Sequence, residues 1–199
     1  MTGTESSESS ADSRERTILT TDVVGSTALL RRYPNDMMGA MDLHDQILHA
    51  AIRRHSGDPF RSTGDGVLAI FDRPLDAVTA AIEAQREMGR IAWGPTGRLQ
   101  IRFGIHTGLT RARGDHDFFG PALPTATRLQ SAANADQILL SGVTVQRMTT
   151  DLLKTPFQLS DLGELSLRDT IERIASDLFD EAPTIQGYVI RIFTKHLRR

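Results

Sequence analysis

Two aspartates are the residues of this chain whose type and position suggest chemistry. The first, Asp22, interrupts an apolar run over residues 18–24, which predicts a buried strand. Burying a carboxylate without a partner carries a large cost in free energy, so Asp22 must meet a cation or a set of N–H donors. Gly25 would let the backbone approach a ligand, and Ser26 or Thr27 could cap a helix whose free N–H groups suit phosphate. A strand that simply ends in a side-chain turn explains the same residues equally well.

The second aspartate, Asp65, lies between Gly64 and Gly66, directly before an apolar run over residues 67–71. Asp-Gly beside such a run is a strong signal for a β-hairpin turn, and turn formation alone could account for the acid. Two acids at the edges of two apolar strands could instead converge on hard divalent cations, which prefer carboxylate oxygens. A metal site is therefore a hypothesis beside the ordinary turn.

The composition excludes several classes of protein. A length of 199 residues with 39% hydrophobic content suits one domain with a real core, and the lack of cysteine rules out disulfides and thiolate metal sites. No apolar run approaches the roughly 20 residues of a membrane-spanning helix, and the first residues lack a signal-peptide core. A formal net charge of -2 gives no overall attraction to nucleic acid or anionic membrane. The sequence thus predicts a soluble, cytoplasmic protein with no nucleic-acid or membrane partner.

The order of the predicted elements is strand, helix, hairpin, helix, strand. This is the order of an α+β, ferredoxin-like βαββαβ core with helices on one face of the sheet. Residues 36–52 carry an apolar helical stripe that includes His44, which we expect to be packed rather than a ligand. His106 adjoins an alternating strand over residues 99–105, where a hydrogen-bonded structural role is favoured over that of a catalytic base.

Five segments of the chain resemble, in order and in spacing, the catalytic domain of the class III nucleotide cyclases, the adenylyl and guanylyl cyclases. The resemblance runs from about Thr17 to about Asp169 and rests on TTDVVGST, HSGDPFRSTGDGVLAIF, RFGIHTG, DFFGPALPTATRL and DLGELSLRD. It implies the ferredoxin-like cyclase fold, with Asp22 and Asp65 side by side on neighbouring strands. It also implies that these acids, helped by the backbone carbonyl of Val23, hold two Mg²⁺ or Mn²⁺ ions against a triphosphate.

The resemblance implies roles for residues that would bind the nucleotide. Asp117 matches the acid that accepts a hydrogen bond from the adenine amino group, and Arg61 stands where the family has a base-reading lysine. One donor and one acceptor complement the N1 and N6 edge of adenine, so ATP is favoured over GTP. Arg128 matches the family's transition-state arginine, and Arg168 stands where the family has a lysine on the terminal phosphates. Residues 25–27 complete the predicted substrate site.

Pro124 is the main departure from the family pattern. Four residues before Arg128 the family usually has an asparagine that orients the ribose, and proline has neither a side-chain amide nor a backbone N–H. That contact cannot be made by this residue. The sequence therefore predicts low activity.

The predicted cyclase domain, residues 16–170, is flanked by two segments of different character. Residues 1–15 are polar and acidic with almost nothing to bury, which predicts a disordered leader. Residues 171–199 combine helical spacing, a strand-prone run over residues 188–193 and a basic end, which predicts a C-terminal helix and tail of unknown role.

Three functional hypotheses follow. The first is a homodimeric adenylyl cyclase that converts ATP to 3′,5′-cyclic AMP and pyrophosphate by two-metal catalysis, with metal acids from one subunit and base-reading and arginine residues from the other. The second is a catalytically degenerate module that binds nucleotide or only dimerises, and Pro124 is its main support. The third is a ferredoxin-like interaction domain without nucleotide, which leaves Asp22 and Asp65 unexplained.

Overall fold

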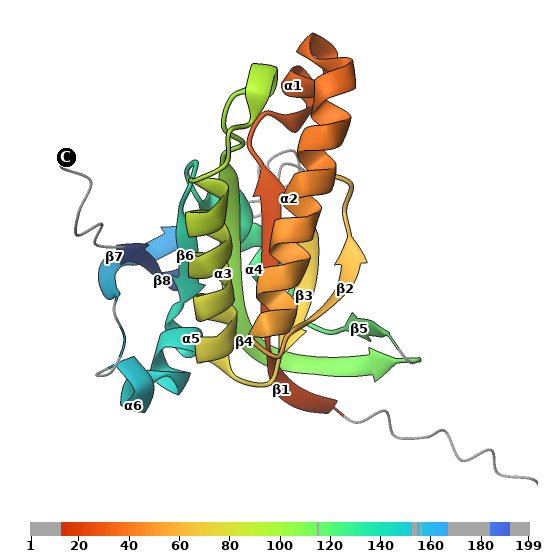
Figure 1. Ribbon diagram of the computed structural model, residues 1–199. Helices are drawn as coiled ribbons and strands as arrows, with labels where there is room; N and C mark the ends of the chain where they lie inside the picture. Colours follow the sequence, from red (N-terminus) through yellow and green to blue (C-terminus); the bar gives the residue numbers. More distant parts are fainter. Residues whose placement is uncertain (1–12, 115, 153–154, 156, 167–183, 192–199) are drawn as a thin grey trace, which may run out of the picture.

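A single sheet in the order β2-β3-β1-β4-β6-β8-β7, with β5 paired to β4, forms the centre of the fold (Figure 1). The computed structural model describes residues 13–114, 116–152, 155, 157–166 and 184–191. The strands are β1 (Ser13–Val23), β2 (Asp58–Ser62), β3 (Val67–Phe71), β4 (Ile101–Arg113), β5 (Asp117–Phe119), β6 (Ile138–Ser141), β7 (Gln158–Ser166) and β8 (Thr184–Arg191). The helices are α1 (Ser26–Arg32), α2 (Pro34–Arg54), α3 (Pro74–Met88), the 3₁₀-helix η1 (Gly94–Thr96), α4 (Ala122–Ala132), α5 (Gly142–Arg147) and α6 (Thr149–Leu152).

The first four strands form the predicted ferredoxin-like core. Strand β1 pairs antiparallel with both β3 and β4, and β2 pairs antiparallel with β3. The helical segment α1–α2 connects β1 to β2, and α3 connects β3 to β4. The order β2-β3-β1-β4 is therefore that of a βαββαβ unit, and the predicted α+β fold class is confirmed.

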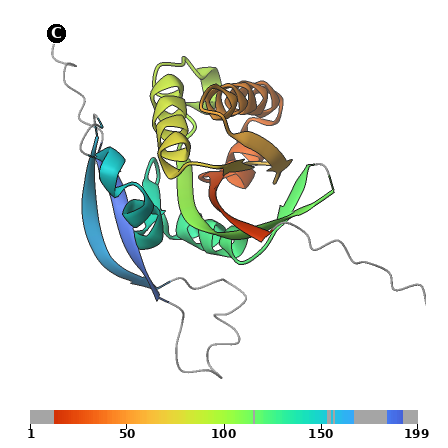
Figure 2. The same ribbon diagram turned by 90° about the horizontal axis from the view of Figure 1, so that it is seen from below.

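Helices cover both faces of this sheet. The two helices of the βαββαβ core share one face, as the sequence predicts, and a later helix adds a layer on the other. Helices α2 and α3 lie on one side, and α4 lies on the other (Figure 2). Neighbouring residues of β1 pack on opposite faces of the sheet. Leu19 packs into the larger core, and Ile18 packs with Ala126 of α4. A Cβ on Gly104 of β4 would lie 2.3 Å from the carbonyl oxygen of Ala126, so glycine lets α4 approach the sheet closely. The second layer is needed because the central strands are apolar on both faces.

The ordered sheet extends beyond the boundaries that the sequence predicts. Strand β1 begins at Ser13, inside the predicted leader 1–15, and Glu15 is held by Arg147, whose Nε donates to Glu15 Oε1 at 2.6 Å. Strand β8 pairs with β6 and β7, so part of the segment 171–199 completes the sheet. Residues 1–12, the predicted helix after residue 170 and the basic end lie outside the described residues. No helix in the described ranges is long and apolar enough to cross a membrane.

Candidate active site

Backbone contacts join the end of β1 to the turn between β2 and β3. The N–H of Val23 donates to the carbonyl oxygen of Asp65 at 3.1 Å. A Cβ on Gly66 would lie 1.9 Å from the carbonyl oxygen of Thr21, so only glycine allows the turn to approach the strand this closely. The structure thus brings Asp22 and Asp65 to neighbouring strand ends, and their role as metal ligands stays a prediction.

Arg102 is the cation that the carboxylate of Asp22 needs. The two residues lie opposite each other in the β1–β4 pairing. Arg102 Nε donates to Asp22 Oδ2 at 3.0 Å, and Arg102 Nη2 donates to the same oxygen. The side chains of Arg102 and Asp22 remain 30% and 23% exposed, so the pair can still meet a ligand. Sequence reasoning did not assign Arg102 to the site, although its polar position in an alternating strand was a usable signal.

Ser26 binds Asp65 instead of capping helix α1. Ser26 Oγ donates to Asp65 Oδ2 at 2.5 Å. The N-cap of α1 is Gly25, with a φ of 70°, and no side chain caps the helix. The prediction that Ser26 or Thr27 caps this helix is therefore wrong. The left-handed turn at Gly25 places Ser26 in the first helical turn, where its hydroxyl reaches the acid.

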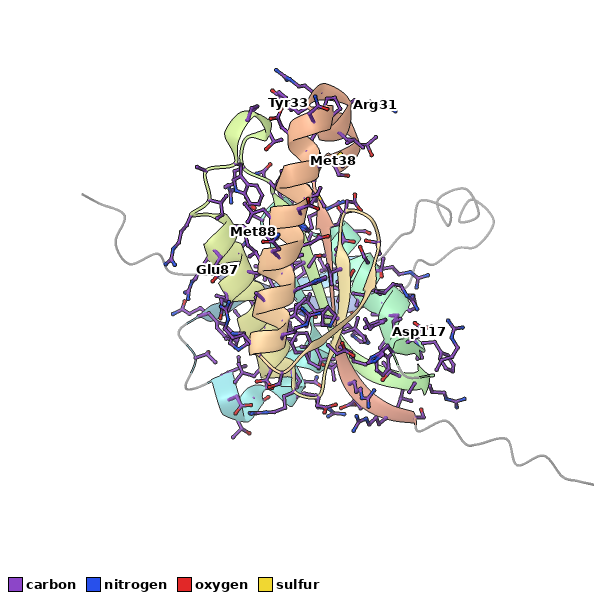
Figure 3. The ribbon with its side chains drawn as sticks, turned by 45° about the vertical axis from the view of Figure 1, so that its right-hand side comes forward. Arg31, Tyr33, Met38, Glu87, Met88 and Asp117 are labelled. Atoms are coloured by element: carbon purple, nitrogen blue, oxygen red, sulfur yellow. The ribbon has the colours of Figure 1, made fainter. Side chains whose placement is uncertain are left out.

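A cavity of about 610 Å³ lies beside Asp65, between the β2–β3 turn and helices α1 and α2. Met38, which lines this cavity, is labelled on α2 in Figure 3. The lining of the cavity combines hydroxyl and carboxylate groups with methionine and leucine side chains. The polar group includes Ser26, Thr27, Thr63 and Asp65, and the apolar group is Leu30, Met37, Met38 and Met41.

Asp117 of β5 accepts hydrogen bonds from two arginines. Arg61 Nη2 donates to Asp117 Oδ1, Arg113 Nε donates to Oδ2 at 2.9 Å, and Arg113 Nη2 donates to that same oxygen. Arg113 first and Arg61 second hold the pKa of Asp117 below its usual value, so the carboxyl stays ionised. The predicted pair of Arg61 and Asp117 is therefore assembled within one chain. Sequence reasoning did not single out Arg113.

The two clusters lie at different ends of β4. Asp22 is opposite Arg102 at the start of this strand, and Asp117 is opposite Arg113 at its end. A strand rises about 3.3 Å per residue, so the 13 residues of β4 separate the clusters widely. Figure 3 shows Asp117 well away from Met38, which lines the cavity beside Asp65.

Helix α4 carries Arg128 and Pro124. Pro124 lies in the first turn of α4. The N–H groups of this turn have no acceptor within the helix, so a proline, which lacks an N–H, is tolerated there. Arg128 lies one turn further along the helix and makes contacts of its own. Arg168 lies outside the described residues, so its predicted role on the terminal phosphates is untested.

His44 and His106 make structural contacts, as the sequence predicts. His106 Nδ1 shares a 2.8 Å hydrogen bond with Ser141 Oγ, and burial lowers the pKa of His106 to about 4. His44 is fully buried, and its Nδ1 lies 2.8 Å from Asp45 Oδ1. Burial lowers the pKa of His44 as well.

The sequence profile that matches this chain is the adenylate and guanylate cyclase catalytic domain, over residues 9–177. The chain belongs to this family. This cyclase domain is 34% identical over 154 residues to uncharacterized protein Rv0891c of Mycobacterium tuberculosis, in a match that covers 76% of the chain and 51% of that protein. It is 26% identical to the receptor-type adenylate cyclase GRESAG 4.2 of Trypanosoma brucei brucei, over 79% of the chain and 35% of that protein. The chain therefore spans about half, or less, of the length of these relatives.

Solved cyclase structures share the fold of this domain. An adenylate/guanylate cyclase/hydrolase from Silicibacter pomeroyi has 29% identity and a TM-score of 0.72, covering 90% of this chain and 97% of that one. A Trypanosoma brucei adenylate cyclase in its monomeric state has a TM-score of 0.78 at 22% identity, covering 91% and 89% of the two chains. The adenylyl cyclase CyaB of Pseudomonas aeruginosa has a TM-score of 0.72 at 20% identity, covering 94% and 99%. The likeness to the last two shows the fold alone.

Asp22 and Asp65 are carboxylates of the kind that divalent cations take as hard oxygen ligands. Within the described residues no group of three or more His, Asp or Glu side chains gathers as a complete metal site. The hydrogen bonds given above engage Oδ2 of both acids, and Oδ1 would be the oxygen that each offers to a metal. Phosphate oxygens of a bound triphosphate would supply further ligands.

Proposed function

We propose that this cyclase domain converts ATP to 3′,5′-cyclic AMP and pyrophosphate at an interface between two copies of the chain. The main support is the junction of β1 with the β2–β3 turn, which sets Asp22 and Asp65 beside each other. Carboxylate oxygens at neighbouring strand ends are the ligands that hard divalent cations prefer. An adenylate cyclase is also what several relatives of the chain are called.

Asp22, Asp65 and the carbonyl of Val23 would hold two Mg²⁺ or Mn²⁺ ions, which would activate the ribose 3′-hydroxyl and offset the charge of the triphosphate. In the reaction the 3′-oxygen forms a bond to the α-phosphorus as the bond from that phosphorus to pyrophosphate breaks. The residues of the chain bind and orient these groups. Arg102 adds a positive charge beside Asp22, and Ser26 and Thr27 line the cavity beside Asp65, where phosphates would enter with help from the backbone at Gly25.

Arg61 and Asp117 would read the base. Arg61 donates to adenine N1, and Asp117 accepts from the N6 amino group, because the lowered pKa keeps its carboxylate ionised. Arg128 would meet the charge that grows on the reacting phosphate, and Arg168 would bind the terminal phosphates.

The separation of the two clusters along β4 supports a shared site in a homodimer. The metal acids of one chain would meet the base-reading residues and Arg128 of the other. Leu109 and Phe119, 55% and 41% exposed, lie on strands β4 and β5 and offer apolar surface for such an interface. The sequence without cysteine suits a reducing compartment, so we place the enzyme in the cytoplasm.

The second candidate function is a degenerate cyclase module that binds nucleotide without turning it over. The specific observation in its favour is Pro124, which cannot supply the amide that orients the ribose. The two functions differ in a direct assay. The purified chain with ATP and either Mg²⁺ or Mn²⁺ should form cyclic AMP if it is an enzyme. Nucleotide-dependent thermal stabilisation without product would support the degenerate module. If the chain shows neither product nor stabilisation, both functions are rejected.

A further inference from the structure

The carboxylate of Asp117 has unequal oxygens. Oδ1 accepts one hydrogen bond, from Arg61 Nη2. Oδ2 accepts two hydrogen bonds from Arg113, through Nε at 2.9 Å and through Nη2. Since each carboxylate oxygen has two lone pairs, Arg113 fills the acceptor capacity of Oδ2, and one lone pair of Oδ1 stays open beside a donor.

Aromatic contacts hold this arrangement in place. The Phe118 ring next to Asp117 packs edge-on against Phe60, with ring centroids 5.2 Å apart. The guanidinium of Arg16 lies 5.1 Å from the Phe118 centroid, and that of Arg61 lies 5.5 Å from the Phe60 centroid. The backbones that carry Arg61 and Asp117 are thus fixed against each other, so the pattern of donors and acceptors is formed before a base arrives.

Purine bases differ in the hydrogen-bond donors and acceptors that they would offer to Arg61 and Asp117. Adenine offers one donor at N6 next to one acceptor at N1. Guanine offers two adjacent donors, at N1 and N2, which a carboxylate satisfies only when both of its oxygens are available. Hypoxanthine, the base of ITP, has the N1 donor of guanine but lacks the N2 amino group.

We propose that Arg113 is a specificity-determining residue of this cyclase domain. By occupying Oδ2 of Asp117 it leaves a single acceptor beside the Arg61 donor, which fits adenine and denies guanine its second acceptor. The inference rests on the proposed function, because it takes Arg61 and Asp117 as the residues that meet the base. Arg113 acts through Asp117 and needs no contact with the substrate.

The test is equilibrium binding of three nucleotides to the full chain with Mg²⁺, using the 3′-deoxy forms of ATP, GTP and ITP, which lack the attacking hydroxyl. The native protein should prefer the ATP analogue and bind the GTP and ITP analogues about equally. Arg113→Ala should raise GTP affinity relative to ITP by roughly tenfold, the scale of one polar group gaining a partner. Arg113→Lys should give a smaller change, because one ammonium leaves part of Oδ2 open.

Two controls separate this effect from loss of charge or loss of structure. Arg111→Ala removes an exposed arginine from the same side of β4 and should leave the GTP to ITP ratio unchanged. Adding Asp117→Ala to Arg113→Ala should cancel the gain for GTP. If the native protein prefers ATP but Arg113→Ala leaves the ratio of GTP to ITP affinity unchanged, the role of Arg113 is overturned and the base site stands. Equal binding of all three nucleotides by the native protein would overturn the base site itself, and this inference with it.

Discussion

The two ends of the candidate site are held by different kinds of contact. At the metal end, backbone hydrogen bonds and a close approach at Gly66 fix the strand end that bears Asp22 against the turn that bears Asp65. At the base end, strand pairing sets Asp117 opposite Arg113, but the ion pairs of Asp117 with Arg61 and Arg113 are made by side chains, of which Arg113 is 70% exposed. A change of backbone at the metal end would therefore shift the acids themselves, whereas loss of one side chain at the base end leaves the β4–β5 pairing in place. We therefore expect changes at the metal end to abolish activity and changes at the base end to alter selectivity.

The largest effect is expected from removing either acid of the metal end. Asp22→Ala or Asp65→Ala should abolish metal-dependent cyclic AMP formation and leave the chain folded, because the backbone contacts between the two segments remain. Product formation and thermal unfolding measure the two properties. Asp42→Ala is the matched control, since Asp42 lines the same cavity from α2 and should keep most activity. Native-like turnover in either acid variant would reject the metal assignment.

Gly66→Ala should impair the same end through the backbone. The new Cβ would meet the carbonyl oxygen of Thr21 at 1.9 Å, so the turn must move away from β1. We expect a lower unfolding temperature and a loss of most activity. Gly39→Ala adds a methyl group to α2 with no heavy atom within 4 Å, and should leave both quantities unchanged or slightly raise stability. Equal behaviour of the two variants would show that the close approach at Gly66 is unimportant.

Pro124→Asn should restore the side-chain amide that orients the ribose in the cyclase family. Misplacing a reacting hydroxyl by about an ångström can cost on the order of a hundredfold in rate. The native chain should therefore be slow, and the variant should raise kcat more than it changes KM for ATP. Steady-state kinetics of both proteins at matched metal concentration measure this. Fast native turnover with no gain in the variant would mean that another group orients the ribose.

Asp117→Ala should give the smallest of these effects on rate. Loss of the acceptor should weaken the preference for ATP over GTP by about 1–3 kcal/mol, typical of a polar partner left unpaired. The ratio of kcat/KM values for the two nucleotides is the measurement. Equal use of ATP and GTP by the native protein would argue against the pair of Arg61 and Asp117.

The same contrast explains what the sequence could predict. The ferredoxin-like order follows from local signals, namely apolar runs and the Gly64-Asp65-Gly66 turn. The placement of Asp22 beside Asp65 was expected only from the resemblance to the cyclase family. Arg102 and Arg113 were not assigned because their partners come from strand register, which local signals do not set. Sequence reasoning did not assign β8 to the sheet, because β8 pairs with β6 and β7 and these pairings depend on the fold.

The position of helix α4 also depends on contacts between segments that are distant in sequence. Gly120 and Pro121 are a signal for the start of a helix, and the helix that holds Arg128 follows them. Its packing on the face opposite α2 and α3 depends on Gly104 of β4, which is remote in sequence. Sequence reasoning therefore identified the helix but did not assign it to a face of the sheet.

The most direct test of a site shared between two chains is complementation between two inactive variants. Asp22→Ala keeps the base-reading residues and Arg128, and Arg128→Ala keeps both metal acids. Each alone should form almost no cyclic AMP. Mixed in equal amounts, they should regain up to about a quarter of native activity, because half of the dimers are mixed and each mixed dimer has one intact site of two. No recovery in a mixture that demonstrably exchanges subunits would contradict a site built from two chains.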